Sequence, residues 1–160
     1  MSNHPLQQPA SEYCKRAAID LNFIRPLGVG TDGAVWETSR GTAIKVFERE
    51  KSYYLEYGCY ERFSEYGITV IEGLEVPQYI GSSDELLVIE MSMVKPPFLL
   101  DFAKVRIDRP PDFSAEVIRD AETKGIEEFG DNWWRVKDAM RTLESYGIYY
   151  LDPRPGNIMF

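Results

Sequence analysis

The sequence predicts an α+β fold, with a five-stranded antiparallel sheet and one helix in a first lobe and a partial, mainly helical second lobe. Residues 22–48 contain three β-type runs separated by turn-forming residues. Residues 50–66 place apolar and aromatic side chains at helical spacing, and residues 133–143 do the same. We therefore expect the first lobe at 21–92 and the second at 93–160.

Residues 1–20 are expected to form a leader and a short helix. Residues 1–10 are polar and contain two prolines, which indicates a disordered leader. Ser11 is a suitable N-cap for a helix that runs to Asp20. The sequence has no basic-then-apolar signal pattern and no apolar run of membrane-spanning length. We therefore expect a cytoplasmic protein without a membrane partner.

Residues 22–48 are expected to form a three-stranded antiparallel meander. A glycine-rich loop within Leu27–Trp36 separates two of the runs, and Ser39-Arg40-Gly41 has the composition of a tight turn. The next helix is expected to span Glu50–Tyr66 and to stop at Gly67, because glycine tolerates the left-handed conformation that ends many helices.

Two further strands complete the predicted sheet, at Val76–Gly81 and Glu85–Met91. The second includes the apolar run Leu86-Leu87-Val88-Ile89, which suits a strand covered on both faces. Pro96-Pro97 interrupts any regular element and marks a linker to the second lobe.

The second lobe is predicted in part. The sequence from 98 to 130 fixes no element, apart from a loop at Arg109-Pro110-Pro111-Asp112. Asp131 or Asn132 can then cap a helix that Gly147 closes. The apolar stripe of that helix consists of Trp133, Val136, Met140 and Leu143.

Composition restricts the classes of function. The chain has 160 residues, of which 44% are hydrophobic, so it can bury a sizeable core. Its formal net charge of −8 argues against a general nucleic-acid binder, which needs clustered Lys and Arg. Cys14 and Cys59 lie far apart without metal-ligand spacing, so both are expected to be reduced thiols.

Two features of the first lobe suggest an anion-binding site. Gly28, Gly30 and Gly33 would let backbone N–H groups approach phosphate oxygens, although a plain hairpin with a flexible turn has the same composition. Lys45 stands alone in an apolar strand, where an unpaired ammonium is costly, so it should meet a carboxylate and a ligand anion. The alternative is an edge lysine whose stem lies along the sheet.

A third feature is the turn Asp152-Pro153-Arg154-Pro155-Gly156-Asn157 near the end of the sequence. These are ordinary residues of a solvated turn, which is the simplest interpretation of the segment alone. The turn nevertheless follows the glycine loop and Lys45 in an order that indicates a function.

The ordered segments resemble the protein-kinase-like family across about residues 22–160. They are the glycine loop, Ala43-Ile44-Lys45, a helix with Glu56, the strand Val88–Met91 and the turn Asp152–Asn157. The resemblance implies transfer of the γ-phosphoryl group of ATP to a hydroxyl, first of all that of a protein Ser or Thr, with Mg²⁺ as cofactor. The implied partners are ATP and a protein or small-molecule acceptor.

The resemblance also implies a role for individual residues. Lys45 would pair with the nucleotide phosphates and with Glu56, for which Glu61 is the competitor. Ile89 would stand at the gatekeeper position, and the segment after it would hold adenine. The implied ATP-binding residues are Gly28, Gly30, Gly33, Val35, Ala43, Lys45, Glu90, Met91 and Ser92.

In the closing turn, the resemblance implies that Asp152 accepts the substrate hydroxyl proton. Arg154 would be a cation near the transferred phosphoryl group, and Asn157 would be a magnesium ligand. With Lys45 and Glu56, Asp152 and Arg154 form the implied catalytic set. Tyr150-Leu151 replaces the His-Arg that usually precedes this Asp.

Two departures leave alternatives open. Pro155-Gly156-Asn157 also resembles the small-molecule branch of the family, which contains aminoglycoside and choline kinases. The family's Asp-Phe-Gly segment lies downstream of the Asn, whereas this sequence ends at Phe160. We therefore expect a fragment, a reduced kinase completed by self-association or a partner chain, or an inactive pseudokinase-type interaction module.

Overall fold

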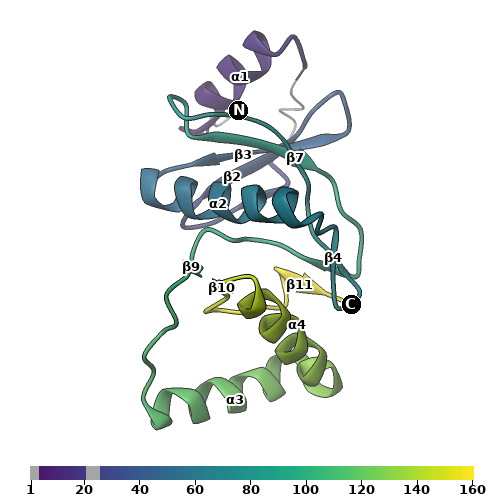
Figure 1. Cartoon of the computed structure of the whole chain (residues 1–160). Helices are drawn as coiled ribbons and strands as arrows, with labels where there is room; N and C mark the ends of the chain where they lie inside the picture. The colour runs from purple at the N-terminus through teal and green to yellow at the C-terminus, as the bar shows by residue number, and fades with distance from the viewer. Residues whose placement is uncertain (1–3, 21–25) are drawn as a thin grey trace.

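The computed structural model describes residues 4–20 and 26–160. Its main layer is a five-stranded antiparallel sheet, which lies between helix α1 and helix α2 (Figure 1). The strand order is β1-β2-β3-β7-β6. The strands span Gly28–Val29 (β1), Gly33–Glu37 (β2), Thr42–Phe47 (β3), Tyr79–Ser83 (β6) and Val88–Ser92 (β7). The predicted α+β class with antiparallel strands is confirmed.

The central strand β3 serves two hydrophobic clusters because its side chains alternate between the faces of the sheet. Ile44 and Val46 pack in a cluster with residues of α1, whereas Ala43 and Phe47 belong to a larger cluster with residues of α2. Lys45 shares the α2 face, since it lies between Ala43 and Phe47 in this alternation. The sheet therefore directs the Lys45 side chain toward α2.

Helix α1 spans Gln7–Arg16 and begins four residues before the predicted cap Ser11. Ala10, Tyr13 and Cys14 are buried at helical spacing against the sheet, and this burial explains the earlier start. The predicted leader is therefore wrong for the residues from Gln7 onward, while residues 1–3 lie outside the described chain. The first predicted β-run, which begins at residue 22, also lies partly outside the described residues.

Helix α2 spans Glu50–Tyr66 and ends at Gly67 in the left-handed conformation (φ 65°), as predicted. The last two strands of the sheet begin later than predicted. Strand β6 begins at Tyr79, and β7 begins at Val88 because the chain turns at Leu87, whose φ is 54°. The predicted apolar strand is therefore half turn and half strand.

The remaining chain forms two small sheets and two helices. One sheet has the order β11-β8-β5-β4, and β10 pairs with β9 in the other. The bounds are Val70–Ile71 (β4), Leu74–Glu75 (β5), Phe98–Leu99 (β8), Arg106–Ile107 (β9), Ile148–Tyr149 (β10), Ile158–Met159 (β11), Ala115–Phe129 (α3) and Trp133–Ser145 (α4), with a 3-10 turn at Gly130–Asn132.

The predicted helix after Asn132 is confirmed as α4. Trp133, Val136 and Leu143 are buried in the same cluster as Phe63 of α2, so one core joins the two parts of the chain. Asn132 has helical backbone angles (φ −86°, ψ −4°) because a 3-10 turn precedes it, and its side chain does not act as the predicted cap.

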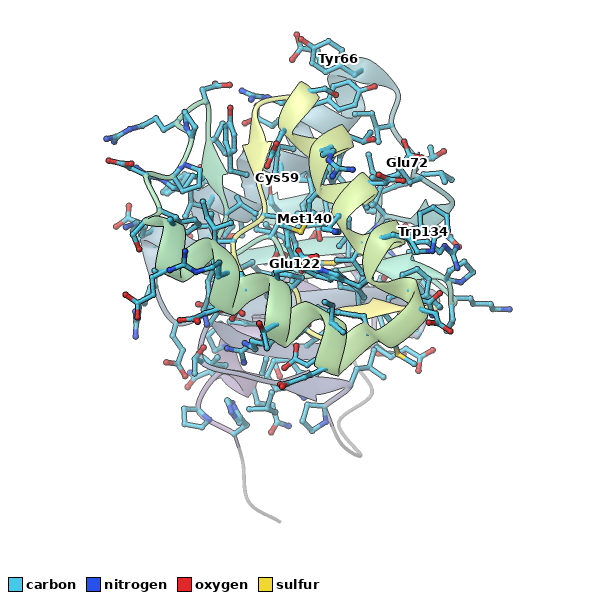
Figure 2. All side chains as sticks on the ribbon, turned by 90° about the horizontal axis from the view of Figure 1, so that it is seen from below. Cys59, Tyr66, Glu72, Glu122, Trp134 and Met140 are labelled. Carbon is cyan, nitrogen blue, oxygen red and sulfur yellow. The ribbon has the colours of Figure 1, made fainter. Side chains whose placement is uncertain are left out.

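Helix α3 lies across α4 at the bottom of the molecule (Figures 1 and 2). Glu122 lies where the two helices meet and accepts a hydrogen bond from Lys137 of α4 at 2.9 Å. Several large apolar side chains of these helices are exposed, among them Ile118 and Ile126 of α3 and Trp134 of α4.

Cys14 and Cys59 are both buried free thiols, as predicted. In the described ranges 4–20 and 26–160, no helix combines the length and the apolarity that a membrane crossing requires.

Candidate functional site

A cleft of about 660 Å³ lies between the glycine loop and the closing turn. It brings together residues that are far apart in the sequence. Nearly all predicted site residues line it: Gly28, Gly30, Gly33, Val35, Ala43, Lys45, Glu56, Met91, Ser92, Asp152, Arg154 and Asn157. This arrangement is consistent with a ligand-binding site, because such sites are concave and lined by apolar walls with a few polar groups.

Glu90 is the predicted site residue whose side chain lies elsewhere in the described chain. It is buried on the α1 side of the sheet, where it accepts hydrogen bonds from Tyr13 (3.0 Å), Arg40 (3.1 Å) and Thr42 (2.7 Å). Strand alternation explains this position, since the neighbours Ile89 and Met91 face the other cluster. The Glu90 carboxylate therefore ties α1 to the sheet, and a contact of Glu90 with a ligand in the cleft would have to come from its backbone.

Ser92 lines the cleft at the end of β7, but two of its polar groups already have a partner. Its backbone N–H donates to the Gln78 carbonyl, and its hydroxyl accepts a hydrogen bond from the Gln78 N–H. These bonds hold the end of β7 against the start of β6.

Lys45 and Glu56 form a buried ion pair at the inner wall of the cleft. The Lys45 Nζ lies 2.8 Å from Glu56 Oε1, and the side chains are 11% and 1% exposed. Of the two predicted partners, the structure therefore brings Glu56 to Lys45, while Glu61 is exposed. The edge-lysine alternative is wrong, because β3 lies in the middle of the sheet.

A second carboxylate, Asp101, also meets Lys45 and was not predicted. Its Oδ1 lies 3.2 Å from Lys45 Nζ, and its Oδ2 accepts a hydrogen bond from Asn157 Nδ2 at 3.3 Å. The signal was present in the sequence, since Asp101 stands between Leu100 and Phe102 as a lone charge in an apolar run. A lone charge in an apolar run needs a partner, as it does at Lys45, so the sequence itself marks Asp101 as a candidate site residue.

The surroundings of Lys45 and Asp101 determine the charges of the two side chains. Burial alone would lower the pKa of Lys45, but the carboxylates of Glu56 and Asp101 outweigh it and hold that pKa above its ordinary value. Burial would raise the pKa of Asp101, but Lys45, the Ala103 N–H and Lys104 together outweigh it and lower that pKa. Lys45 is therefore a cation and Asp101 an anion near neutral pH.

The segment that carries Asp101 is anchored on both sides. The Leu100 N–H donates to the Asn157 carbonyl at 2.8 Å, and the Leu100 carbonyl accepts a hydrogen bond from Tyr150 at 2.5 Å. The Phe102 N–H donates to Glu56 at 2.9 Å, and its ring is fully buried. These contacts hold Asp101 between α2 and the closing turn.

Asp152 also lines the cleft, and a cation lies near each of its carboxylate oxygens. Arg154 Nε donates to its Oδ2 at 2.8 Å, and Lys124 of α3 lies 3.6 Å from its Oδ1. Arg154 is 58% exposed and Lys124 52% exposed, so both side chains can turn toward a ligand. Sequence patterns gave no reason to select Lys124, because its element was not predicted.

The glycine loop is a tight hairpin, in which the Gly30 N–H donates to the Gly33 carbonyl at 2.9 Å. A Cβ at Gly28 or Gly30 would meet no atom within 4 Å. A Cβ at Gly33 would lie 1.9 Å from the Val46 carbonyl oxygen in the neighbouring strand. The first two glycines therefore leave open space at the cleft, and the third is required by the sheet.

We expect Gly33→Ala to lower the free energy of unfolding by about 2–3 kcal/mol or more, because the backbone of β3 must move to admit the methyl group. Gly30→Ala is the matched control and should leave that free energy within ~0.5 kcal/mol of the wild type. Urea unfolding followed by circular dichroism measures both. Equal stabilities would mean that β2 and β3 do not approach this closely.

Neither the scan of family models nor the search of curated proteins gives a match. Among solved structures, the chain is similar to a streptomycin–ATP–APH(2″)-IIa ternary complex, with 14% identity and a TM-score of 0.45 over 89% of this chain and 42% of that chain. It is also similar to a gentamicin–APH(2″)-IIa complex, with 15% identity and a TM-score of 0.49 over 98% of this chain and 43% of that chain. The chain thus spans less than half of these solved chains, and likeness at this level does not define an activity or a substrate.

Proposed function

We propose that this chain is an ATP-binding phosphotransferase domain of the protein-kinase-like type, which transfers the γ-phosphoryl group to a hydroxyl acceptor. The observation that carries the proposal is the buried Lys45–Glu56 pair in the cleft between the glycine hairpin and the Asp152–Asn157 turn. A lysine held in this way presents a fixed positive charge to the phosphates of a nucleotide.

The apolar part of the cleft suits a nucleobase. Val35, Ala43 and Met91 line it from three neighbouring strands, and Pro77 lines it beside them. Backbone groups of the segment around Glu90 and Ser92, other than the Ser92 N–H that donates to Gln78, would supply the polar contacts to the base. Gly28 and Gly30 would admit the phosphates.

The polar part of the cleft suits phosphoryl transfer. Asp152 would accept the proton of the acceptor hydroxyl, and Arg154 would turn from Asp152 toward the transferred group. Asn157 would hold Mg²⁺ through its side-chain oxygen, since oxygen ligands suit this ion. When bound, Mg²⁺ neutralises charge on the phosphate oxygens. The acceptor is a hydroxyl of a protein or of a small molecule.

Calorimetric titration with ATP, in Mg²⁺ and in a chelator, tests the proposal. Wild-type protein should bind ATP saturably. Lys45→Met should weaken binding roughly 10- to 150-fold, because a hydrogen bond to a charged group is worth about 1.5–3 kcal/mol. Lys51→Met is the matched control at an exposed lysine. A folded Lys45→Met protein with unchanged affinity would contradict the role of Lys45.

The second candidate function is a pseudokinase-type interaction module. The exposed apolar side chains Ile118 (58%), Ile126 (54%) and Trp134 (62%) favour it, because they belong to α3 and α4, the two helices at one end of the molecule (Figure 1). A folded wild-type protein that does not bind ATP and is dimeric by light scattering would support this function over phosphotransfer.

A further inference from the structure

The pairing of β8 with β11 brings two distant polar side chains together. The strands are antiparallel, with Leu99 opposite Ile158. Asp101 follows β8, and Asn157 immediately precedes β11, so both side chains stand at the same end of this strand pair. The Asp101–Asn157 contact of 3.3 Å is the result.

The two oxygens of Asp101 have different surroundings. Its Oδ1 contacts Lys45 Nζ at 3.2 Å and the Ala103 N–H at 3.3 Å. Its Oδ2 contacts the amide of Asn157, which has an oxygen and a nitrogen of nearly equal shape. Rotation of this amide by half a turn would place the Asn157 oxygen beside Asp101 Oδ2, so that two oxygens could bind one metal ion. The Asp101 side chain is 31% exposed, which leaves it accessible to an ion.

Charge balance also distinguishes Asp101 from a merely structural partner of Lys45. Glu56 alone already neutralises Lys45 at 2.8 Å. Asp101 therefore adds a negative charge to a cleft that is proposed to receive polyphosphate. Lys104, a further cation that lines the cleft, is engaged by Asp32 and Thr31. The Asp101 carboxylate and the phosphates of a bound nucleotide would repel each other, most strongly where water is excluded. A cation between the carboxylate and the phosphates is therefore needed.

We propose that Asp101 and Asn157 together hold the divalent cation of bound ATP. The metal carboxylate then comes from the segment after β8, which precedes the Asp152–Asn157 turn in the sequence. The inference rests on the proposed function. The donor set fits the ion, because Mg²⁺ in nucleotide sites takes one or two carboxylates, keeps several waters and completes its octahedron with phosphate oxygens.

A grouping of three or more carboxylates, imidazoles or thiols that could hold a metal without a nucleotide is not found within residues 4–20 and 26–160. The site is therefore expected to bind a cation weakly by itself and more tightly with ATP. This property separates it from a structural metal site, which binds its ion through protein ligands alone.

The first test compares ATP affinity in Mg²⁺ with ATP affinity in a chelator, for wild type, Asp101→Asn, Asn157→Ala and the exposed control Asp112→Asn. Wild type and Asp112→Asn should bind more tightly in Mg²⁺. Asp101→Asn and Asn157→Ala should lose roughly tenfold or more of this gain, since even outer-shell groups are worth ~10–100-fold in metal affinity. Affinity of Asp101→Asn in the chelator should be unchanged or higher, because a repulsive charge is gone.

The second test uses Mn²⁺ alone, with its binding followed by water-proton relaxation, and thermal unfolding confirms that each variant is folded. Weaker Mn²⁺ binding by Asp101→Asn and Asn157→Ala than by Asp112→Asn would support the metal site, even if the wild type bound no ATP. In that case only the proposed function would be contradicted. Equal Mg²⁺ gain and equal Mn²⁺ binding in wild type and Asp101→Asn would overturn the metal site and leave ATP binding intact.

Discussion

Replacement of Glu56 by alanine is expected to lower the free energy of unfolding by about 3–5 kcal/mol, the usual cost of leaving a buried charge without its partner. The Glu56 carboxylate accepts hydrogen bonds from Lys45 (2.8 Å), the Phe102 N–H (2.9 Å) and Tyr60 (3.4 Å). Asp101 still balances Lys45 in this variant, which places the effect near the lower end of the range.

Urea unfolding measures this loss, and Glu61→Ala is its matched control on the exposed side of the same helix. Glu61→Ala should stay within ~0.5 kcal/mol of the wild type. Glu56→Gln should be intermediate, because it keeps a hydrogen-bond acceptor but loses the charge that Lys45 needs. If Glu56→Ala were as stable as Glu61→Ala, the Lys45–Glu56 ion pair would not stabilise the structure of the cleft.

Much of the five-stranded sheet and of helix α2 could be predicted, because the sequence patterns that indicate these elements are local. Helix α2 begins and ends as expected, since its apolar spacing and the left-handed Gly67 lie within the helix or next to it. The segment from 98 to 130 could not be predicted. Strand β8 has two residues, and its partners in β5 and β11 lie far away in the sequence. No local pattern encodes such a pairing.

The residues of the candidate site were also predictable only where a local sequence pattern indicates them. Lys45 was identified because a lone charge in an apolar strand needs a partner, and the same signal at Asp101 lay in a segment without a predicted element. The place of Glu90 in the motif predicts a cleft residue, which is wrong for its side chain. Strand alternation could have corrected this, because a residue between the cluster residues Ile89 and Met91 must face the other side.

Asp152→Asn is expected to lower the rate of phosphoryl transfer by ~10²–10⁴-fold, the usual contribution of a positioned general base. Its effect on ATP affinity should be small, since Asp152 would contact the acceptor and not the nucleotide. Phosphate release from ATP, with water as acceptor, measures the rate before the natural acceptor is identified. Asp112→Asn is the matched control at an exposed aspartate.

The contacts of Asp152 make this experiment decisive. Arg154 and Lys124 both approach its carboxylate, at 2.7 and 3.6 Å, so the oxygens of Asp152 are already engaged and partly shielded from an acceptor. If Asp152 is the base, Arg154 must leave it for the phosphates, and Asp152→Asn must lose the rate while it keeps ATP binding. If both rate and affinity survive, Asp152 only anchors Arg154, and a different group must accept the proton. If the wild type binds ATP but releases no phosphate, nucleotide binding stands without phosphotransfer to water.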